Sequence, residues 1–259
     1  MTRLTTIAGV LPPKNMTINI SLPKITPLTD GYTFQFKEGV NLITGLNSSG
    51  KTRIANELIK SIYIDPQHHL DPSLILIDEN ICRFVDSKFL KELINSSEST
   101  VHTQICETAN NILISYDPLA RKSIGKIIFI DRKFRFENDS LAAYSERFLL
   151  AFSLILTCRI LNKQLENMPL IFDGVLGLLD QYNINFLIEL IRRYIKFSVV
   201  LENPCAIDFL DYGVKKSKFS THYKLVLKIP KERYRDSMNG YLEITSIPSE
   251  EYRSKIEKF

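Results

Sequence analysis

The segment from Gly39 to Ile59 limits what this chain can fold into more than any other stretch. Within it, Gly45 to Thr52 reads GLNSSGKT and matches the phosphate-binding loop pattern G-x-x-x-x-G-K-[ST]. The apolar run Val40 to Ile43 precedes this loop, and Arg53 to Lys60 places apolar side chains at helical spacing. The sequence therefore predicts a buried strand, a phosphate loop and a helix in succession, within a single large α/β core.

The chemistry of a phosphate loop explains the spacing of this motif. Glycines let the backbone wrap around a triphosphate with its N–H groups toward the oxygens, and the helix N-terminus adds partial positive charge. Lys51 is expected to reach the β- and γ-phosphates of ATP, and the Thr52 hydroxyl to hold Mg²⁺. The residues predicted to surround the nucleotide are Gly45, Asn47, Ser48, Ser49, Gly50, Lys51 and Thr52. A chance glycine-rich turn is the competing interpretation.

Composition narrows the class of protein. The chain has 259 residues, of which 44% are hydrophobic and 24% charged, as in ordinary globular proteins. The longest apolar run, Phe148 to Cys158, is shorter than the roughly 20 residues that span a bilayer, and Pro12 interrupts the N-terminal apolar stretch too early for a signal peptide. The scattered cysteines fit free thiols in a reducing cytoplasm better than a zinc site: Cys82, Cys106, Cys158 and Cys205. We expect a soluble cytoplasmic protein with no membrane partner.

The net charge of +4 is mild, but basic residues gather between Tyr212 and Arg235, where Glu232 is the one acid. These residues are Lys215, Lys216, Lys218, Lys224, Lys228, Lys231, Arg233 and Arg235. A solvated surface strand and loop fits this pattern, and so does a groove for nucleic-acid phosphate or for an acidic partner subunit.

Two alternating segments, Met16 to Ile25 and Tyr32 to Phe36, predict an antiparallel β unit before the phosphate loop. That order is uncommon in small-molecule kinases, whose phosphate loop usually opens the chain. Further strands are expected at Leu74–Ile77, Ile81–Val85, Lys126–Ile130, Phe134–Phe136 and Phe197–Leu201. Helices are expected at Ser87–Ile94, Thr103–Ile114, Glu146–Leu165, with Ser145 as its N-cap, and Asn183–Ile195.

The run from Pro169 to Asp173 reads as a buried strand that ends in a carboxylate, which is the Walker B pattern. Asp173 is expected to accept the Mg²⁺ shell that Thr52 holds. A helix cap or a turn residue after a strand is the competing interpretation of Asp173.

The chain resembles the SMC/RecF-type ABC ATPases from about Met16 to Leu201. In that family the signature L-S-x-G-E-R-Q-L-L-A-L precedes Walker B and a loop ending in Leu-Asp; here Ala142 to Phe152 reads AAYSERFLLAF and Leu179 precedes Asp180. The resemblance implies a P-loop ATPase of ABC type, with a mixed sheet, an N-terminal antiparallel β lobe and flanking helices. It also implies head-to-head dimerisation around ATP, with the same chain or another ATPase head, in which Ser145 and Asp180 reach toward the partner.

Within that group, Ile171 to Asp180 (IFDGVLGLLD) looks most like the D-T/S-P-L-G-R-L-D run of the ATPase of DNA sulfur-modification (phosphorothioation) systems. The matching positions are Asp173, Leu176, Gly177, Leu179 and Asp180. This similarity implies a role in DNA modification, repair or anti-phage defence, together with DNA or DNA-modifying partner proteins.

Several family positions are changed in this chain. The signature Ser aligns with Ala143 and the signature Gly with Ser145. The catalytic Glu that often follows the Walker B Asp is Gly174, and the usual switch His is replaced by Glu202 or Asn203. Loss of a water-positioning group commonly costs orders of magnitude in rate, so hydrolysis is expected to be slow or to depend on a partner.

We therefore expect Lys51 and Asp173 to carry the catalytic chemistry, and hypothesise that Glu202 replaces the missing base. About 90 residues separate Thr52 from Ala143, too few for the coiled coil of a long SMC protein, and no heptad array is present. The expected organisation is an ABC-type ATPase domain over residues 1–204 and a basic, β-containing C-terminal appendage over residues 205–259, with strands at Tyr223–Ile229 and Tyr241–Ile247.

Three functions remain open on the sequence alone. The first is an SMC-like ATPase, and the second is a nucleotide-gated scaffold that hardly turns ATP over, which Gly174 and the altered signature favour. The third is the nucleotide-binding subunit of a transporter, disfavoured because no Q-loop glutamine is readable at the expected distance. A small-molecule kinase is weaker still, since it does not need the Leu179-Asp180 element.

Overall fold

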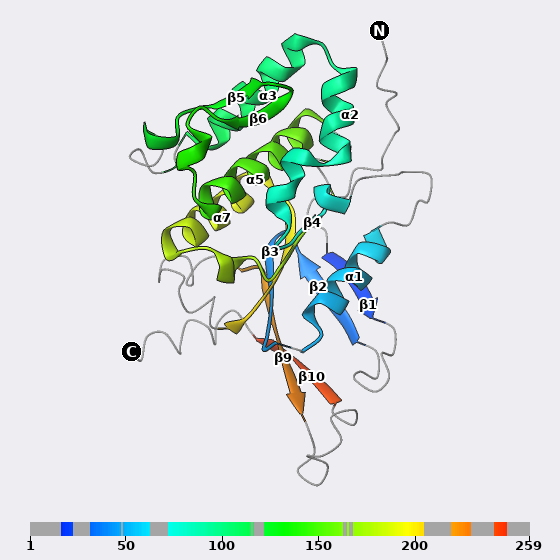
Figure 1. The fold of residues 1–259 in the computed structure, drawn as a ribbon. Helices are drawn as coiled ribbons and strands as arrows, with labels where there is room; N and C mark the ends of the chain where they lie inside the picture. Colours follow the sequence, from blue (N-terminus) through cyan, green and yellow to red (C-terminus); the bar gives the residue numbers. More distant parts are fainter. Residues whose placement is uncertain are drawn as a thin grey trace.

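A six-stranded sheet forms the centre of the protein (Figure 1), with the strand order β10-β9-β3-β8-β7-β4. The structure is a computed structural model that describes residues 17–22, 32–47, 49–62, 72–114, 116, 122–162, 165, 168–204, 219–228 and 241–247. The strands are β3 (Gly39–Gly45), β4 (Leu76–Ile77), β7 (Leu170–Asp173), β8 (Phe197–Glu202), β9 (Thr221–Lys228) and β10 (Tyr241–Ile247). Within this sheet β10 pairs antiparallel with β9, and all the remaining strand pairs are parallel. The carboxyl ends of the parallel strands therefore share one edge.

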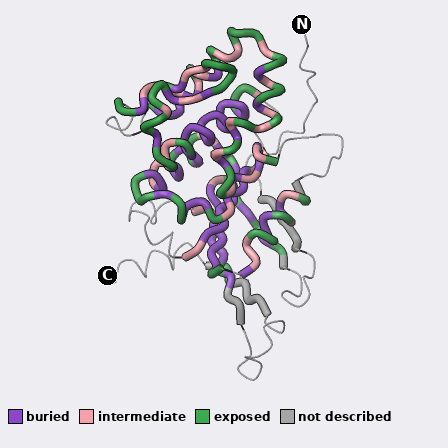
Figure 2. Tube along the Cα trace, in the orientation of Figure 1, coloured by how far each residue is buried: buried purple, intermediate pink, exposed green. Residues whose placement is uncertain are grey.

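Side chains of the central strands alternate between two buried faces, as a sheet covered on both sides requires. On β3, Val40 and Leu42 enter one apolar cluster and Ile43 enters the other. Helices α5 (Tyr144–Leu161) and α7 (Gln181–Tyr194) contribute to the first cluster. Helix α1 (Lys51–Ile62) and strand β2 (Tyr32–Lys37) contribute to the second, and β2 pairs antiparallel with β1 (Thr17–Leu22) as predicted. Figure 2 shows the buried residues concentrated along these central strands and α5.

A smaller helical layer lies beyond α5 (Figure 1). It contains α2 (Lys88–Ser96), α3 (Ser99–Ile112) and the hairpin β5 (Ile127–Ile130) and β6 (Lys133–Phe136). The Asn110 amide of α3 exchanges two hydrogen bonds with the backbone of Ile127, at 2.8 and 2.9 Å, and so fixes the hairpin to the helix. α5, which this layer covers, is buried from Phe148 to Arg159, in agreement with its predicted place in the core.

The segment after β4 differs from the prediction. The strand expected at Ile81–Val85 is wrong, because Ile81–Asp86 forms a 3₁₀ helix, η2. Its buried residues, Ile81 and Phe84, are three positions apart, which is one turn of a 3₁₀ helix, so both side chains point to the same side and are buried. In a strand, the same two side chains would point to opposite sides. Similarly, the strand predicted to begin at Leu74 is reduced to Leu76–Ile77, after the 3₁₀ turn η1 (Pro72–Leu74).

The predicted N-cap of α5 is also wrong. Ala143 occupies the cap position without a side-chain hydrogen bond, and Ser145 lies inside the first turn. Its hydroxyl donates instead to Glu146 Oε2 at 3.3 Å. A hydroxyl just before an acidic residue resembles a cap in sequence, but the chain enters the helix two residues earlier.

The C-terminal strands extend the central sheet. β9 pairs in parallel with β3, from Asn41 opposite Thr221 to Gly45 opposite Leu225. The division of the chain after residue 204 stays a prediction, although these strands share one sheet with the phosphate-loop strand. Within the basic stretch from Tyr212 to Arg235, positions 212–218 and 229–235 lie outside the described residues, while Lys224 is described and exposed.

Arg159 of α5 is a buried cation between two chain segments. Only 2% of it is exposed, and burial lowers the pKa of its guanidinium to about 10. It donates to the carbonyl of Leu74, just before β4, at 2.8 Å, and to the carbonyl of Met168, just before β7. One side chain thus holds the entrances of two adjacent parallel strands.

A buried polar contact joins β9 to β3 beside the phosphate loop. His222 Nε2 lies 2.8 Å from the Thr44 hydroxyl, and burial, followed by the charge of Lys224, lowers the pKa of His222 to about 4. The imidazole is therefore neutral in the folded protein at pH 7 and stays so well below the pH at which a free histidine gains its proton.

We expect this histidine to make stability depend on pH. As the pH falls from 7 toward 4, the unfolded chain binds a proton at His222 before the folded chain does, so the free energy of unfolding falls; the shift corresponds to about 3 kcal/mol at most. Urea unfolding at pH 7, 6 and 5 measures the slope. A His222→Gln variant should lose this part of the slope, and an unchanged slope in that variant would assign the pH dependence to other groups.

Candidate functional site

The phosphate loop leaves the sheet at the end of β3 and enters α1. Gly45 is the last residue of β3 and Lys51 the first of α1. Gly50 has a φ of 89°, a backbone conformation that glycine adopts without strain, and it turns the chain into the helix. Asn47 is exposed and Ser49 buried; Ser48, also predicted to bind the nucleotide, lies outside the described residues.

Lys51 lies against its own loop and faces two carboxylates. Its Nζ donates to the carbonyls of Gly45 at 2.6 Å and Leu46 at 3.0 Å. Burial lowers the pKa of Lys51, while the charges of Glu202 and Asp173 oppose this shift. A cation therefore lies at the mouth of the loop, between two backbone carbonyls and two acidic side chains.

Three adjacent parallel strands each end at a carboxylate. Strand β4 is followed by Asp78, β7 ends at Asp173 and β8 ends at Glu202. The register places Ile77 opposite Phe172, Asp173 opposite Leu201 and Thr44 opposite Glu202. These acids therefore form a row along the edge from which the phosphate loop rises.

Asp173 and Thr52 have the donor chemistry of a magnesium site. The Thr52 side chain hydrogen-bonds to Asp173, which lowers the pKa of that carboxyl against the larger raising effect of burial. A hydroxyl and a carboxylate oxygen are hard ligands of the kind that Mg²⁺ takes together with phosphate oxygens. Within the described residues no group of three acidic, histidine or cysteine side chains could hold a metal on its own.

Asp78 was missed by the sequence analysis. Its charge raises the pKa of Asp173, and its Oδ1 accepts a hydrogen bond from the backbone N–H of Asn80 at 2.8 Å. The signal was present, because Leu74 to Ile77 is an apolar run that ends in an acid, just as the run before Asp173 does. The pairing of β4 with β7, which the sequence does not specify, places the two acids together.

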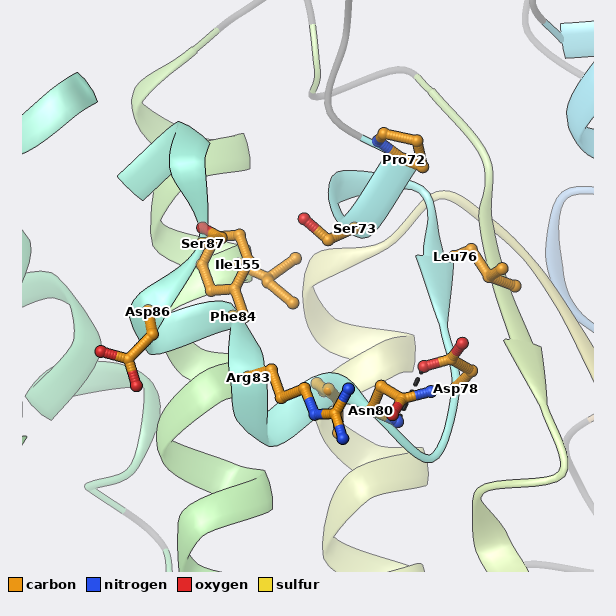
Figure 3. Close-up of a pocket in the computed structure, with 11 residues that line it drawn as sticks. Pro72, Ser73, Leu76, Asp78, Asn80, Arg83, Phe84, Asp86, Ser87 and Ile155 are labelled. Atoms are coloured by element: carbon orange, nitrogen blue, oxygen red, sulfur yellow. Dashed lines mark hydrogen bonds between the residues drawn. The ribbon is translucent and has the colours of Figure 1, made fainter. Parts of the chain in front are cut away.

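A cavity of about 550 Å³ borders Asp78 on the side away from β7 (Figure 3). Phe84 and Ile155 form an apolar part of its lining, and Ser73 turns its hydroxyl inward. The Arg83 guanidinium extends toward Asn80 and Asp78, whereas Asp86 turns away and pairs with Lys133 at 2.9 Å. The cavity thus adjoins the row of carboxylates at its β4 end.

Glu202 is nearly enclosed, with 3% of the residue exposed. Its Oε2 accepts from the backbone N–H of Leu176 at 2.7 Å and its Oε1 from that of Asn203 at 2.7 Å. Burial raises the pKa of Glu202, while these N–H groups, that of Gly177 and the charge of Lys51 act in the opposite direction. The carboxylate therefore bridges the turn after β8 and the loop after β7.

Gly174 occupies the position at which the ABC resemblance expects a catalytic Glu. Its φ is 68°, in the left-handed region that strains any residue with a Cβ. A Cβ placed there would meet nothing within 4 Å. The backbone, rather than crowding, therefore disfavours a side chain at this position.

Ser145 and Asp180 belong to a second group, at the N-terminal ends of α5 and α7. Asp180 caps α7, accepting from the backbone N–H of Asn183 at 2.9 Å and from its side-chain amide at 2.6 Å. Between the two helices lies Tyr116, whose hydroxyl is 3.3 Å from Glu146 Oε1. Burial, followed by the charges of Glu146 and Asp180, raises the pKa of Tyr116.

Two solved SMC heads share this fold. The SMC head domain from Thermotoga maritima superposes with a TM-score of 0.51 and 12% identity, over 90% of this chain and 99% of that one. An SMC head bound to the C-terminal winged-helix domain of ScpA gives a TM-score of 0.57 and 11% identity, over 89% and 98% of the two chains. An inward-facing metal-chelate type ABC transporter gives 0.44 and 10% identity, over 90% and 97%.

No protein-family model and no curated protein sequence matches the chain. Among the helices in the described ranges, none has the length and apolar character that crossing a bilayer demands. The chain has the mixed α/β fold of these two SMC heads: a largely parallel central sheet with flanking helices.

Proposed function

We propose that the protein is an SMC-like ATPase that binds ATP with Mg²⁺ on the phosphate loop. The observation that carries this proposal is the convergence of Lys51, Thr52 and Asp173 at one end of the sheet. Lys51 supplies the positive charge for the β- and γ-phosphates, and the N-terminus of α1 adds partial positive charge beside them. Thr52 and Asp173 hold Mg²⁺, which neutralises charge that develops on the phosphate oxygens during hydrolysis.

Dimerisation around ATP is the second part of the proposal. Large apolar side chains are exposed on the elements that border the site: Leu46 in the phosphate loop, Leu178 after β7, Tyr182 in α7, Leu141 just before α5 and Tyr144 at the start of α5. Exposed apolar side chains around a charged site are typical of surfaces that associate. Ser145 and Asp180 lie on the same elements and are proposed to face the nucleotide of the second head.

The test combines ATP binding with a measurement of molecular mass. We expect purified protein to bind a fluorescent ATP analogue only with Mg²⁺ present, and its mass in light scattering to double with ATP. Leu178→Asp should leave binding by the single head unchanged and weaken the dimer at least about tenfold, because it places a carboxylate in an apolar contact. Absence of ATP binding by the wild-type protein would refute the proposed function.

Gly174 favours a second candidate, a scaffold that binds ATP and releases it intact. Gly174 has a left-handed backbone and no side-chain carboxylate that could position water. In that case ATP-dependent dimers form and persist, while phosphate release stays at the background rate. Slow turnover that a partner protein accelerates would favour the ATPase.

The finer proposal concerns DNA. The resemblance of Ile171 to Asp180 to the ATPase of phosphorothioation systems supports a role in DNA modification, repair or anti-phage defence. The basic stretch from Tyr212 to Arg235 supplies charge suited to phosphate. Partner proteins are also proposed, since an SMC head of this fold was solved bound to the winged-helix domain of ScpA. Turnover that is unchanged by DNA, at low and high salt, would count against the DNA part.

A further inference from the structure

We infer that Glu202 is a positioning residue, whose carboxylate holds the loop between β7 and α7, residues 174–180, against the end of β8. The loop thereby presents Leu178 and Asp180 to a second head. This inference rests on the proposed dimerisation around ATP, and it differs from the sequence-based hypothesis that Glu202 is the base for water.

The loop is anchored at three places, and Glu202 supplies the middle one. At its start, the Gly174 N–H donates to the carbonyl of Leu201 in β8 at 2.9 Å. At its end, Asp180 caps α7. Between them, the Leu176 N–H donates to Glu202 across 26 positions of sequence, and the Gly177 N–H points to the same carboxylate.

Charge makes the middle anchor strong. A hydrogen bond from a backbone N–H to a carboxylate is roughly twice as strong as one between neutral groups, and burial removes water as a competitor. With Glu202 removed, the Leu176 N–H loses its acceptor beneath a loop whose apolar side chains Val175 and Leu176 are fully buried.

The same carboxylate is poorly placed to act on water. A general base needs an oxygen within reach of the water that attacks. Glu202 is 3% exposed, and each of its oxygens already accepts a backbone N–H at 2.7 Å. The contacts that satisfy it are those of a structural anchor.

Glu202 also links the loop to the nucleotide. Its charge acts on Lys51, which carries the proposed phosphate contact. The next residue, Asn203, places its amide nitrogen 3.5 Å from Asn47 Oδ1 in the phosphate loop. Asn203 is thus the single residue that connects Glu202 to Asn47 of the phosphate loop.

The experiment compares Glu202→Gln and Glu202→Ala with Glu92→Gln, which changes an exposed glutamate of α2. Hydrogen exchange of a peptide spanning 174–180 measures the anchor, light scattering with ATP measures the dimer, and titration measures ATP affinity of the single head. We expect Glu202→Ala to speed exchange of the 174–180 amides at least about tenfold and to weaken the dimer by a similar factor. ATP affinity of the single head should change by a smaller factor than the dimer, because Glu202 acts on Lys51 through its charge alone, and Glu202→Gln, which keeps one accepting oxygen, should lie between.

A different pattern would overturn the inference. If Glu202 is the base, Glu202→Gln leaves exchange of the loop unchanged, abolishes turnover and lets ATP-bound dimers accumulate. If the wild-type protein binds no ATP, the proposed function fails, yet the exchange measurement still decides whether Glu202 anchors the loop. Should Glu202→Ala not fold, Glu202→Gln provides the same comparison, with thermal unfolding as the control for general destabilisation.

Discussion

Replacing Lys51 with alanine is expected to abolish nucleotide-dependent behaviour. Lys51 is the cation that faces both Asp173 and Glu202, so its loss leaves two acids beside the triphosphate without compensating charge. Removing one charged donor to a transition state costs on the order of 100- to 1000-fold in rate. ATP turnover, ATP binding and ATP-dependent dimers should all fall together, as followed by phosphate release, titration and light scattering.

Lys60→Ala is the matched control for this change. Lys60 lies in the last turn of the same helix, at the end far from the phosphate loop, and pairs with Glu57 at the surface. Its replacement should leave turnover and binding within about twofold, since exposed pairs of this kind contribute little. If Lys51→Ala retained most of the turnover, the hydrolysis would have to occur outside the phosphate loop.

Replacing Arg159 with alanine is expected to cause the largest loss of stability. Two carbonyls, of Leu74 and Met168, lose their donor, and the buried side chain leaves a cavity in the core. Lost buried hydrogen bonds and a cavity of this kind together cost about 3–5 kcal/mol. Urea unfolding followed by circular dichroism measures the change in the free energy of unfolding.

Two further variants separate the causes of this loss. Arg159→Met keeps most of the side-chain volume without the donors, so its loss should be smaller than that of alanine, because less cavity is made. Arg192→Ala removes a surface arginine of α7 that pairs with Glu189, and should cost less than about 1 kcal/mol. A loss below 1 kcal/mol for Arg159→Ala would show that the strand entrances are held without this guanidinium.

The order of strands and helices around the phosphate loop was predictable because local sequence patterns determine each of these elements. The alternation in β2 buries Phe34 and Phe36, and helix α5 buries every residue from Phe148 to Arg159, as their patterns predict. The 3₁₀ helix at Ile81–Asp86 was not predictable, because a short apolar segment fits either structure and tertiary packing decides between them.

The partners within the site were less predictable than its members. Lys51, Thr52 and Asp173 were predicted from motifs, whereas the position of Asp78 beside Asp173 follows only from the pairing of β4 with β7. Glu202 was identified as an acid near the site, whereas its bonds to the loop after β7 depend on how two strands and a turn pack. Long-range contacts of this kind leave no periodicity in the sequence.

The pairing of β9 with β3 has a consequence for synthesis of the protein. Asn41 in β3 and Thr221 in β9 are hydrogen-bonded although 180 positions separate them, so the phosphate-loop strand leaves the ribosome long before its neighbour exists. At roughly 5–20 residues per second, that edge waits for about ten seconds or more. Until then β3 offers an unpaired edge, the kind of surface that chaperones cover and that aggregates form on. A nascent chain that stops before residue 221 therefore carries the whole phosphate loop on an unfinished sheet.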